Sequence, residues 1–435
     1  MTTAPPRRGQ TGLVVLPLRY MIAAAAAFLL SALAVPWLAP DLGGHYYQPR
    51  LLALTHAVAL GFITLTIMGA SYQIVPIVLE RPIWTARLAR WQLWFFGVGT
   101  VGMVVHLYLG QWAGLGWAAG LTVLGIAAHV LNVSLSLRGL PRWTFTARLV
   151  AAGTVGLGLT AVFGLGLAGA RMGLYAAPDP LGLVAAHFHL ALLGWVMPML
   201  IGVSARLYPM FLLTQEPGAR AARVQLWGLL LGVPIAVAGL GAWPALVLPG
   251  ALAVGAAVIG HGLAVAAMLR TRKRPALDWG LRAAVTGTAF LLPVVLVGLA
   301  LASGLLSGPR ATLAYAVLAL GGAVSLTIAG MLLKIVPFLV WQRVYAPRVG
   351  RARVPTLAEL SWPRAEAIAY VGLAGGPLVL AAAVAAGHVA SIRAAGVLLA
   401  LGAVAFGGAL ARVLAHLAAG ATRRETRAPA SVSLP

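Results

Sequence analysis

The chain has 435 residues, of which 61% are hydrophobic and only 9% are charged, and its mean hydropathy is +0.94. This composition excludes a soluble domain and indicates an integral membrane protein built from helices. The net charge of +23 comes from arginines in short segments between apolar runs, so they are topology signals and we expect no nucleic-acid partner. Because the chain has no cysteine, disulfides, thiolate metal sites and c-type haem attachment are excluded.

Twelve apolar runs approach or exceed the length of about 20 residues that crosses a lipid bilayer. They lie at 20–39, 51–79, 92–112, 117–137, 149–170, 182–213, 224–243, 246–269, 283–305, 311–340, 367–387 and 393–418. Most of the Lys and Arg residues fall on one side of this arrangement, which places both termini in the cytoplasm. The longest cytoplasmic loop is expected at 341–366.

Three of these runs share one pattern, which aligns without a gap over residues 56–76, 189–209 and 317–337. The alignment keeps two glycines, at 61, 194 and 322 and at 69, 202 and 330, and a proline at 76, 209 and 337. Internal repetition is a usual build of polytopic membrane proteins. We therefore predict one membrane domain over 1–435 with three four-helix repeats, 15–140, 147–275 and 280–420. The glycines favour close helix packing, with contact to a flat ligand as the alternative.

Histidines occupy the first column of this pattern in two repeats, as His56 and His189, and the third repeat has Val317 there. An imidazole inside a membrane needs a partner, and such residues are candidates for function by default. His187 lies two residues before His189, about 200° around a helix, so the two are expected to face different spaces. Tyr315 holds the equivalent place in the third repeat.

The other histidines are weaker candidates. His106, in the third apolar run, is the best additional cofactor ligand, whereas His129, His261 and His416 stand near the inner ends of their runs. A histidine suits the negative end of a helix dipole, so those three are predicted to be structural. The acidic residues fall in loops or at the ends of runs, which leaves no intramembrane carboxylate of the kind that proton pumps use.

The residues of the second and sixth runs resemble catalytic subunit I of the haem–copper oxidase and nitric oxide reductase superfamily. The matching residues are Thr55-His56, Gly61, Met68 and Pro76, then Ala186-His187-Phe188-His189, Gly194-Trp195, Pro198 and Tyr208-Pro209-Met210-Phe211. The resemblance covers nearly the whole chain and implies the twelve-helix fold of that family, arranged in three arcs. It also implies that His56 is an axial haem ligand and that His187 and His189 fall in the region of a copper ligand.

The chain also departs from this family. In the family the seventh helix carries a His-His pair for copper and the tenth supplies two haem ligands, but runs 224–243 and 311–340 contain no histidine. A complete haem–copper centre is therefore not expected, and neither is terminal oxidase activity. The chain is more similar to orphan relatives such as the NnrS-type haem membrane proteins, which are associated with the response to nitric oxide.

We accordingly expect one or more b-type haems, with one held between the second and sixth runs by His56 and His189. Arg50, on the outer side, is the candidate partner of a haem propionate. The expected function is electron transfer, or handling of nitric oxide or haem, in the plasma membrane of a prokaryote. A quinol or a cytochrome is the expected electron donor.

Two alternatives stay open at this point. In the first, the protein is a transporter without a redox cofactor, and Arg206 and Lys334 line an anion or substrate path. In the second, His187 and His189 handle copper together with Met197 and Met199. The sequence does not determine the oligomeric state.

Overall fold

The computed structural model describes residues 10–79 and 82–425, and within these ranges every regular element is a helix. Twelve helical segments are long and apolar enough to cross a membrane, which confirms the predicted number of spans. They are Val15–Ala34, Pro49–Ile77, Ala86–Leu109, Trp112–Leu137, Phe145–Arg171, Pro180–Leu212, Ala219–Gly241, Pro244–Arg270, Trp279–Ala302, Pro309–Val344, Pro363–Ala386 and Val389–Ala418. Below, these are called spans 1 to 12.

Several spans are built from more than one helical element. The elements around the site are α1 (Gln10–Ala34), α3 (Pro49–His56), η1 (Ala57–Thr64), α4 (Leu65–Leu79), α5 (Ala86–Leu109), α6 (Trp112–Leu137), α7 (Phe145–Arg171), α8 (Pro180–His189), η2 (Leu190–Val196) and α9 (Met197–Leu212). The later ones are α10 (Ala219–Gly241), α11 (Val247–Arg270), α12 (Trp279–Ala289), α13 (Leu291–Ala302), α14 (Pro309–Ala316), η4 (Val317–Ser325), α15 (Leu326–Val344), α17 (Pro363–Ala386) and α18 (Val389–Glu425). Short elements α2 (Ala39–Leu42), η3 (Pro244–Leu246), η5 (Ala346–Arg348) and α16 (Leu357–Leu360) lie between spans or begin one.

Many span boundaries differ by a few residues from the sequence expectation, and two of the differences affect the segments between spans. The first span ends at Ala34 rather than at residue 39, because Pro36 disfavours helical geometry at the residue before it. The loop expected over 341–366 is shorter, since α15 continues to Val344 and α17 begins at Pro363. Between them α16 is held by a capping box, in which Thr356 and Glu359 each bond the other's backbone N–H.

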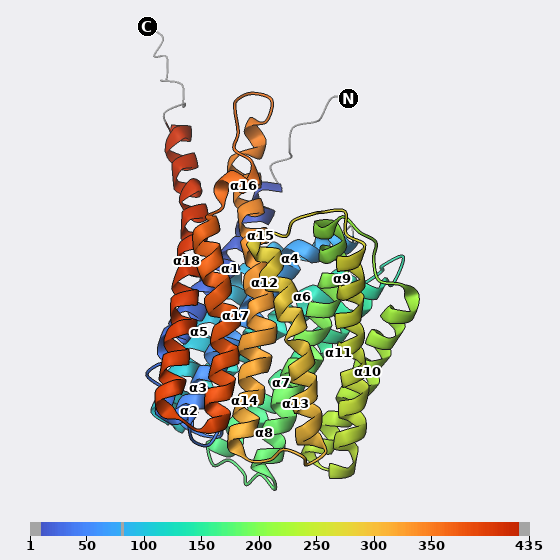
Figure 1. Ribbon diagram of the computed structural model, residues 1–435, viewed down its shortest axis with the longest axis vertical. Helices are drawn as coiled ribbons and strands as arrows, with labels where there is room; N and C mark the ends of the chain where they lie inside the picture. The colour runs from blue at the N-terminus through green and yellow to red at the C-terminus, as the bar shows by residue number, and fades with distance from the viewer. Residues whose placement is uncertain (1–9, 80–81, 426–435) are drawn as a thin grey trace.

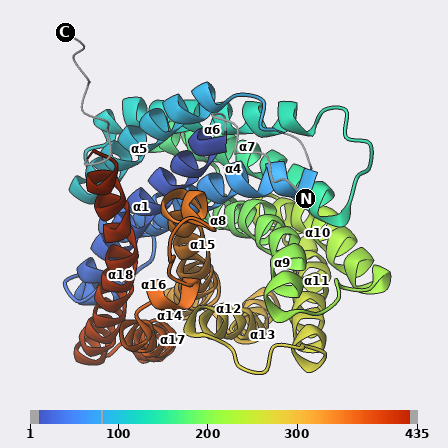
Figure 2. The ribbon, with the colours of Figure 1, turned by 90° about the horizontal axis from the view of Figure 1, so that it is seen from above.

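The three spans that carry the repeated pattern form the centre of the bundle. Spans 2, 6 and 10 have 56%, 67% and 67% of their most apolar windows buried, more than any other span described. Seen from above, α4, α9 and α15 lie inside, and the remaining helices surround them (Figure 2). Large apolar side chains such as Leu30, Val101 and Leu263 are exposed on the outer helices, as a lipid-facing surface requires.

Each central span contains a stretch of π-helix at the same place in the pattern. The stretches are η1, η2 and η4, and the first two begin directly after His56 and His189. A π-helix is wider than an α-helix and occurs mostly as a short interruption, frequently at functional sites. It also changes the rotation of every residue that follows, so side-chain directions along these spans do not follow a regular helix.

The repeated glycines pack helices closely. A Cβ atom on Gly202 in α9 would lie 2.9 Å from the Cβ of Leu149 in α7, closer than side chains approach. Gly69 and Gly330, in the same column, lie equally tightly against α1 and α12. Small residues allow such contact between membrane helices. The alternative that these glycines touch a flat ligand is therefore not needed.

The helix count also fixes the relative position of the two ends of the bundle. The start of α1 and the end of α18 lie at the same end of the molecule, which is also where α15 ends (Figure 1). This agrees with an even number of spans. That this side is the cytoplasmic one stays a prediction from the arginines.

Candidate functional site

The largest cavity described lies between spans 2 and 6 and is walled on its far side by α5, α6 and α7. Its volume is about 200 Å³ without its open side. Small-molecule sites usually measure about 300–1,000 Å³, so a large ligand would also occupy the open side of this cavity. Its walls are formed mainly by aliphatic side chains, and Met103, Phe188 and Trp195 also contribute to them.

His56 and His187 both line this cavity. Their ring centroids are 6.4 Å apart, and the two ring planes differ by only 22°. Nδ1 of His56 lies 2.7 Å from the carbonyl oxygen of Leu52, one helical turn earlier. With the proton on Nδ1, that ring donates to the carbonyl and keeps the lone pair of Nε2 free. Nδ1 of His187 is buried and has no hydrogen-bond partner among the described residues.

This separation suits two ligands on opposite sides of one metal ion. An imidazole nitrogen binds a metal ion at about 2 Å, and the ring centre lies about 1 Å further away, so the two centroids would be about 6 Å apart. Within residues 10–79 and 82–425, no group of three or more His, Asp or Glu side chains could hold an ion by itself. Two axial histidines fit a metal whose other positions are filled by a macrocycle such as haem.

His189 lies elsewhere. Its Nδ1 is 2.8 Å from the carbonyl oxygen of Ala185, its Nε2 is 3.3 Å from the hydroxyl of Tyr315, and the two rings stack at 5.7 Å. It does not line the cavity of His56. The sequence expectation that His187 and His189 face different spaces therefore agrees with the structure, but the residue that shares a cavity with His56 is His187. Tyr315 faces His189, not His187.

The mouth of the cavity carries a cation that the sequence did not single out. Arg171, the last residue of α7, lines the cavity together with Tyr47. Its guanidinium carbon lies 4.0 Å from the ring centre of Tyr47 and 4.9 Å from that of Trp112, and its Nε donates to the Tyr47 hydroxyl at 2.9 Å. In the sequence Arg171 was one of several basic residues of the outer loops, and nothing distinguished it from them.

Arg50 and His106 are not at this cavity. Arg50 forms an ion pair with Asp41 at 3.7 Å and lies over the ring of Tyr108. Nε2 of His106 accepts a hydrogen bond of 3.1 Å from the indole N–H of Trp117, and neither residue lines the cavity. The bond occupies the nitrogen that would otherwise be available for a metal, which weakens His106 as a ligand.

Of the three histidines that the sequence assigned to helix ends, His129 and His261 are buried inside their spans instead, whereas His416 is only partly buried and lies near the end of span 12. His129 is 0% exposed, and its Nδ1 lies 3.2 Å from the hydroxyl of Tyr72. Its ring meets that of Trp195, which lines the cavity and donates from Nε1 to the hydroxyl of Thr64 at 3.2 Å. The structural role predicted for His129 stays a prediction, and a tertiary polar contact rather than the helix dipole would support it. The hydrogen-bonded pair of Trp195 and Thr64 thus forms part of the cavity wall.

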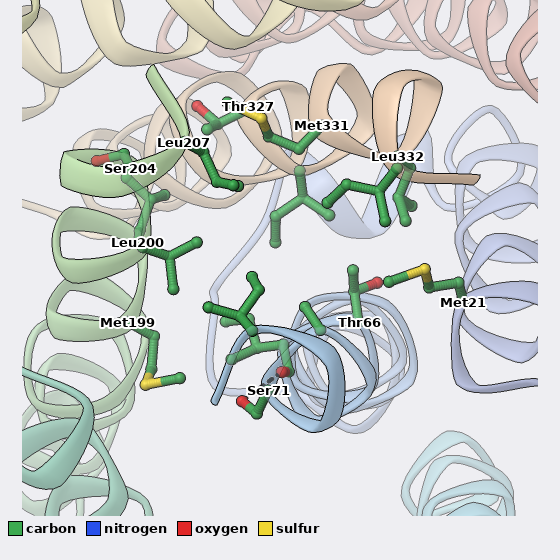
Figure 3. A pocket seen from close by; sticks show the side chains of 16 residues that line it. Met21, Thr66, Ser71, Met199, Leu200, Ser204, Leu207, Thr327, Met331 and Leu332 are labelled. Atoms are coloured by element: carbon green, nitrogen blue, oxygen red, sulfur yellow. Dashed lines mark hydrogen bonds between the residues drawn. The ribbon is translucent and has the colours of Figure 1, made fainter. Parts of the chain in front are cut away.

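Two further cavities have no histidine, aspartate or glutamate in their walls. One lies on the central axis between α1, α4, α9 and α15, leaves about 80 Å³, and has apolar walls with the methionines facing it from different sides (Figure 3). Another, of about 110 Å³, lies between spans 2 and 10, where Leu54 and Val317 line it. The resemblance to the oxidase family predicts a haem in the latter space, but its walls are mainly apolar and carry no histidine.

The residues of the alternative functions are engaged in other contacts. Arg206 pairs with Glu216 at 2.5 Å, and Lys334 pairs with Asp278 at 2.5 Å. Each of these cations therefore has a carboxylate partner, and that of Lys334 is shared with Arg274. Met197 and Met199 are 1% and 3% exposed, and Met199 lines the central cavity instead of facing the histidines.

Comparison with known proteins finds no family model that matches the chain and no curated protein sequence that matches it. The oxidase-type relationship therefore rests on the residues quoted above and stays a prediction.

Proposed function

We propose that this protein binds b-type haem between spans 2 and 6, with His56 and His187 as the axial ligands. The observation that carries the proposal is the pair of nearly parallel imidazole rings, 6.4 Å apart in the largest cavity described. The sequence favoured His56 with His189. We replace His189 because it does not line this cavity and its Nε2 lies next to Tyr315.

The protein residues have separate tasks in this site. The bond from His56 to the carbonyl of Leu52 fixes the tautomer and the ring direction, which raises the basicity of the ligating nitrogen. The aliphatic walls exclude water and so help to set the reduction potential. Bound haem supplies one-electron chemistry at its iron.

The contacts between spans support the proposed threefold repeat of oxidase subunit I type. Residues at 56, 189 and 317 form one column of the pattern, and those at 54, 187 and 315 form another. Each first-column residue shares a contact or a cavity with the second-column residue of the next repeat. The pairs are His56 with His187, His189 with Tyr315, and Val317 with Leu54. On this proposal, only the first of these three equivalent pairs, His56 with His187, has kept two histidine ligands.

The proposed activity is electron transfer, or handling of nitric oxide or haem, in the plasma membrane of a prokaryote with both termini in the cytoplasm. A quinol or a cytochrome is the proposed donor. A second metal such as copper has no support beyond the histidines already used, because His189 and the buried methionines do not converge with them. Terminal oxidase activity is not proposed, since α10, α14, η4 and α15 carry no histidine.

Purified protein tests the proposal directly. It should be red, show a Soret band, and contain haem b by the pyridine haemochrome assay, with negligible copper by metal analysis. A matched control is the His56→Ala, His187→Ala double variant, which should insert in the membrane and contain no haem at this site. Colourless wild-type protein that also fails to bind added haem would refute the proposal.

A further inference from the structure

Arg171 at the mouth of the cavity is held in an unusual way for a surface arginine. Its guanidinium lies against two aromatic rings, those of Tyr47 at 4.0 Å and Trp112 at 4.9 Å. Arginine stacks well on aromatic faces, and such stacking fixes the plane of its N–H groups. The bond from Nε to the Tyr47 hydroxyl adds a second restraint. The side chain is therefore ordered before any ligand arrives.

The charge of Arg171 has no carboxylate partner within the described part of the chain. Four ion pairs occur there, and they engage Arg50, Arg206, Arg274 and Lys334. Only Nε of Arg171 has a hydrogen-bond partner among the described residues, so its terminal N–H groups are available. Such groups present a rigid fork that matches both oxygens of a carboxylate.

The position of this cation defines the ligand that the cavity suits. Arg171 and Tyr47 line the same cavity as His56 and His187, whose remaining walls are mainly aliphatic. A ligand that fills the space would be apolar over most of its surface, bind the imidazoles through a metal, and carry an anionic group at the mouth. Arg50, the sequence candidate for that anionic group, already pairs with Asp41 and lies outside the cavity lining.

We infer that Arg171, ordered by Tyr47 and Trp112, binds a carboxylate of the cavity's ligand. The inference rests on the proposed function: with haem as the ligand, the carboxylates would be the porphyrin propionates, held by Arg171 at the end of span 5. Arg171 thereby selects a porphyrin with free propionates and sets its orientation.

Binding of haem and of haem dimethyl ester to the haem-free protein in detergent tests the inference. The ester has the same iron and ring but no carboxylate charge. Wild-type protein should bind haem roughly tenfold or more tightly than the ester, since a hydrogen bond to a charged group contributes about 1.5–3 kcal/mol. The preference should shrink to near onefold in Arg171→Gln, be partly kept in Arg171→Lys, and be unchanged in the control Arg50→Gln.

The outcomes separate the inference from the proposed function. If wild-type protein binds haem and ester equally, or if Arg171→Gln keeps the full preference, the inference is overturned while haem binding stands. If neither compound produces a Soret shift in wild-type protein, both are overturned. The comparison of haem with ester in wild-type protein needs no variant, so a folding defect in Arg171→Gln would not remove the test.

Discussion

Replacement of Asp278 tests how the one lysine in a central span is held. Asp278 is the N-cap of α12, and its Oδ1 accepts the backbone N–H of Leu281 at 3.0 Å. Its Oδ2 accepts from Lys334 at 2.5 Å and from Arg274 at 3.0 Å. The side chains of Lys334 and Asp278 are 20% and 31% exposed, so the pair is only partly screened by solvent.

The expected loss of stability follows from these contacts. Removing an N-cap costs about 1 kcal/mol, and each partly exposed ion pair contributes about 0.5–1 kcal/mol. We therefore expect Asp278→Ala to lower the free energy of unfolding by about 2–3 kcal/mol. Asp278→Asn, which keeps a capping side chain, should lower it by about 1–2 kcal/mol. In a cycle with Lys334→Met, the coupling between the two positions should be about 1 kcal/mol.

Reversible unfolding by SDS in mixed micelles measures these free energies. Asp179 provides a matched control, since it caps α8 through a 3.0 Å bond from Gly182 and forms no ion pair among the described residues. Asp179→Ala should therefore cost about 1 kcal/mol and Asp179→Asn almost nothing. If Asp278→Asn is as stable as wild type, Lys334 is not held by Asp278, and the transport alternative that uses Lys334 regains support.

Two further predictions concern topology and chemistry. Reporter fusions after residue 140, after residue 275 and at the C-terminus should report the cytoplasm and one near residue 175 the outside, because basic residues stay inside; a C-terminus found outside would contradict the orientation. Purified protein given a quinol or a reduced cytochrome should show no sustained oxygen consumption at enzymatic rates of about 1–1000 per second, because α10 and span 10 offer no histidine for a haem–copper centre. Rapid oxygen consumption that cyanide inhibits would contradict this prediction.

The spans could be predicted from the sequence because their cause is local. A bilayer demands about 20 apolar residues in a row, and the chain shows this directly at each of the twelve spans. The close packing of Gly202 on Leu149 was likewise suggested by the repeated small residues. The end of the first span at Ala34 could have been placed from Pro36, a signal that the hydropathy of the run concealed.

The partner of His56 could not be predicted in this way. The choice between His187 and His189 depends on how span 6 is rotated against span 2. The π-helices directly after His56 and His189 change the rotation of the rest of each span relative to these histidines, so the packing of that part does not predict which histidine faces the other span. A repeat alignment places residues in columns, but it does not say which column of one unit meets which column of the next. The same holds for Arg171 and Arg50, which both stand at ends of spans and are both predicted to lie on the outer side.

The axial pair is the central claim, and the spectra of two single variants test it most directly. His187→Ala and His189→Ala, each purified as an inserted and monodisperse protein, are compared with wild type by optical and electron paramagnetic resonance spectroscopy. We predict that His187→Ala loses the low-spin bis-histidine signal and that His189→Ala retains it. Loss of that signal in His189→Ala with an unchanged spectrum in His187→Ala would contradict the account.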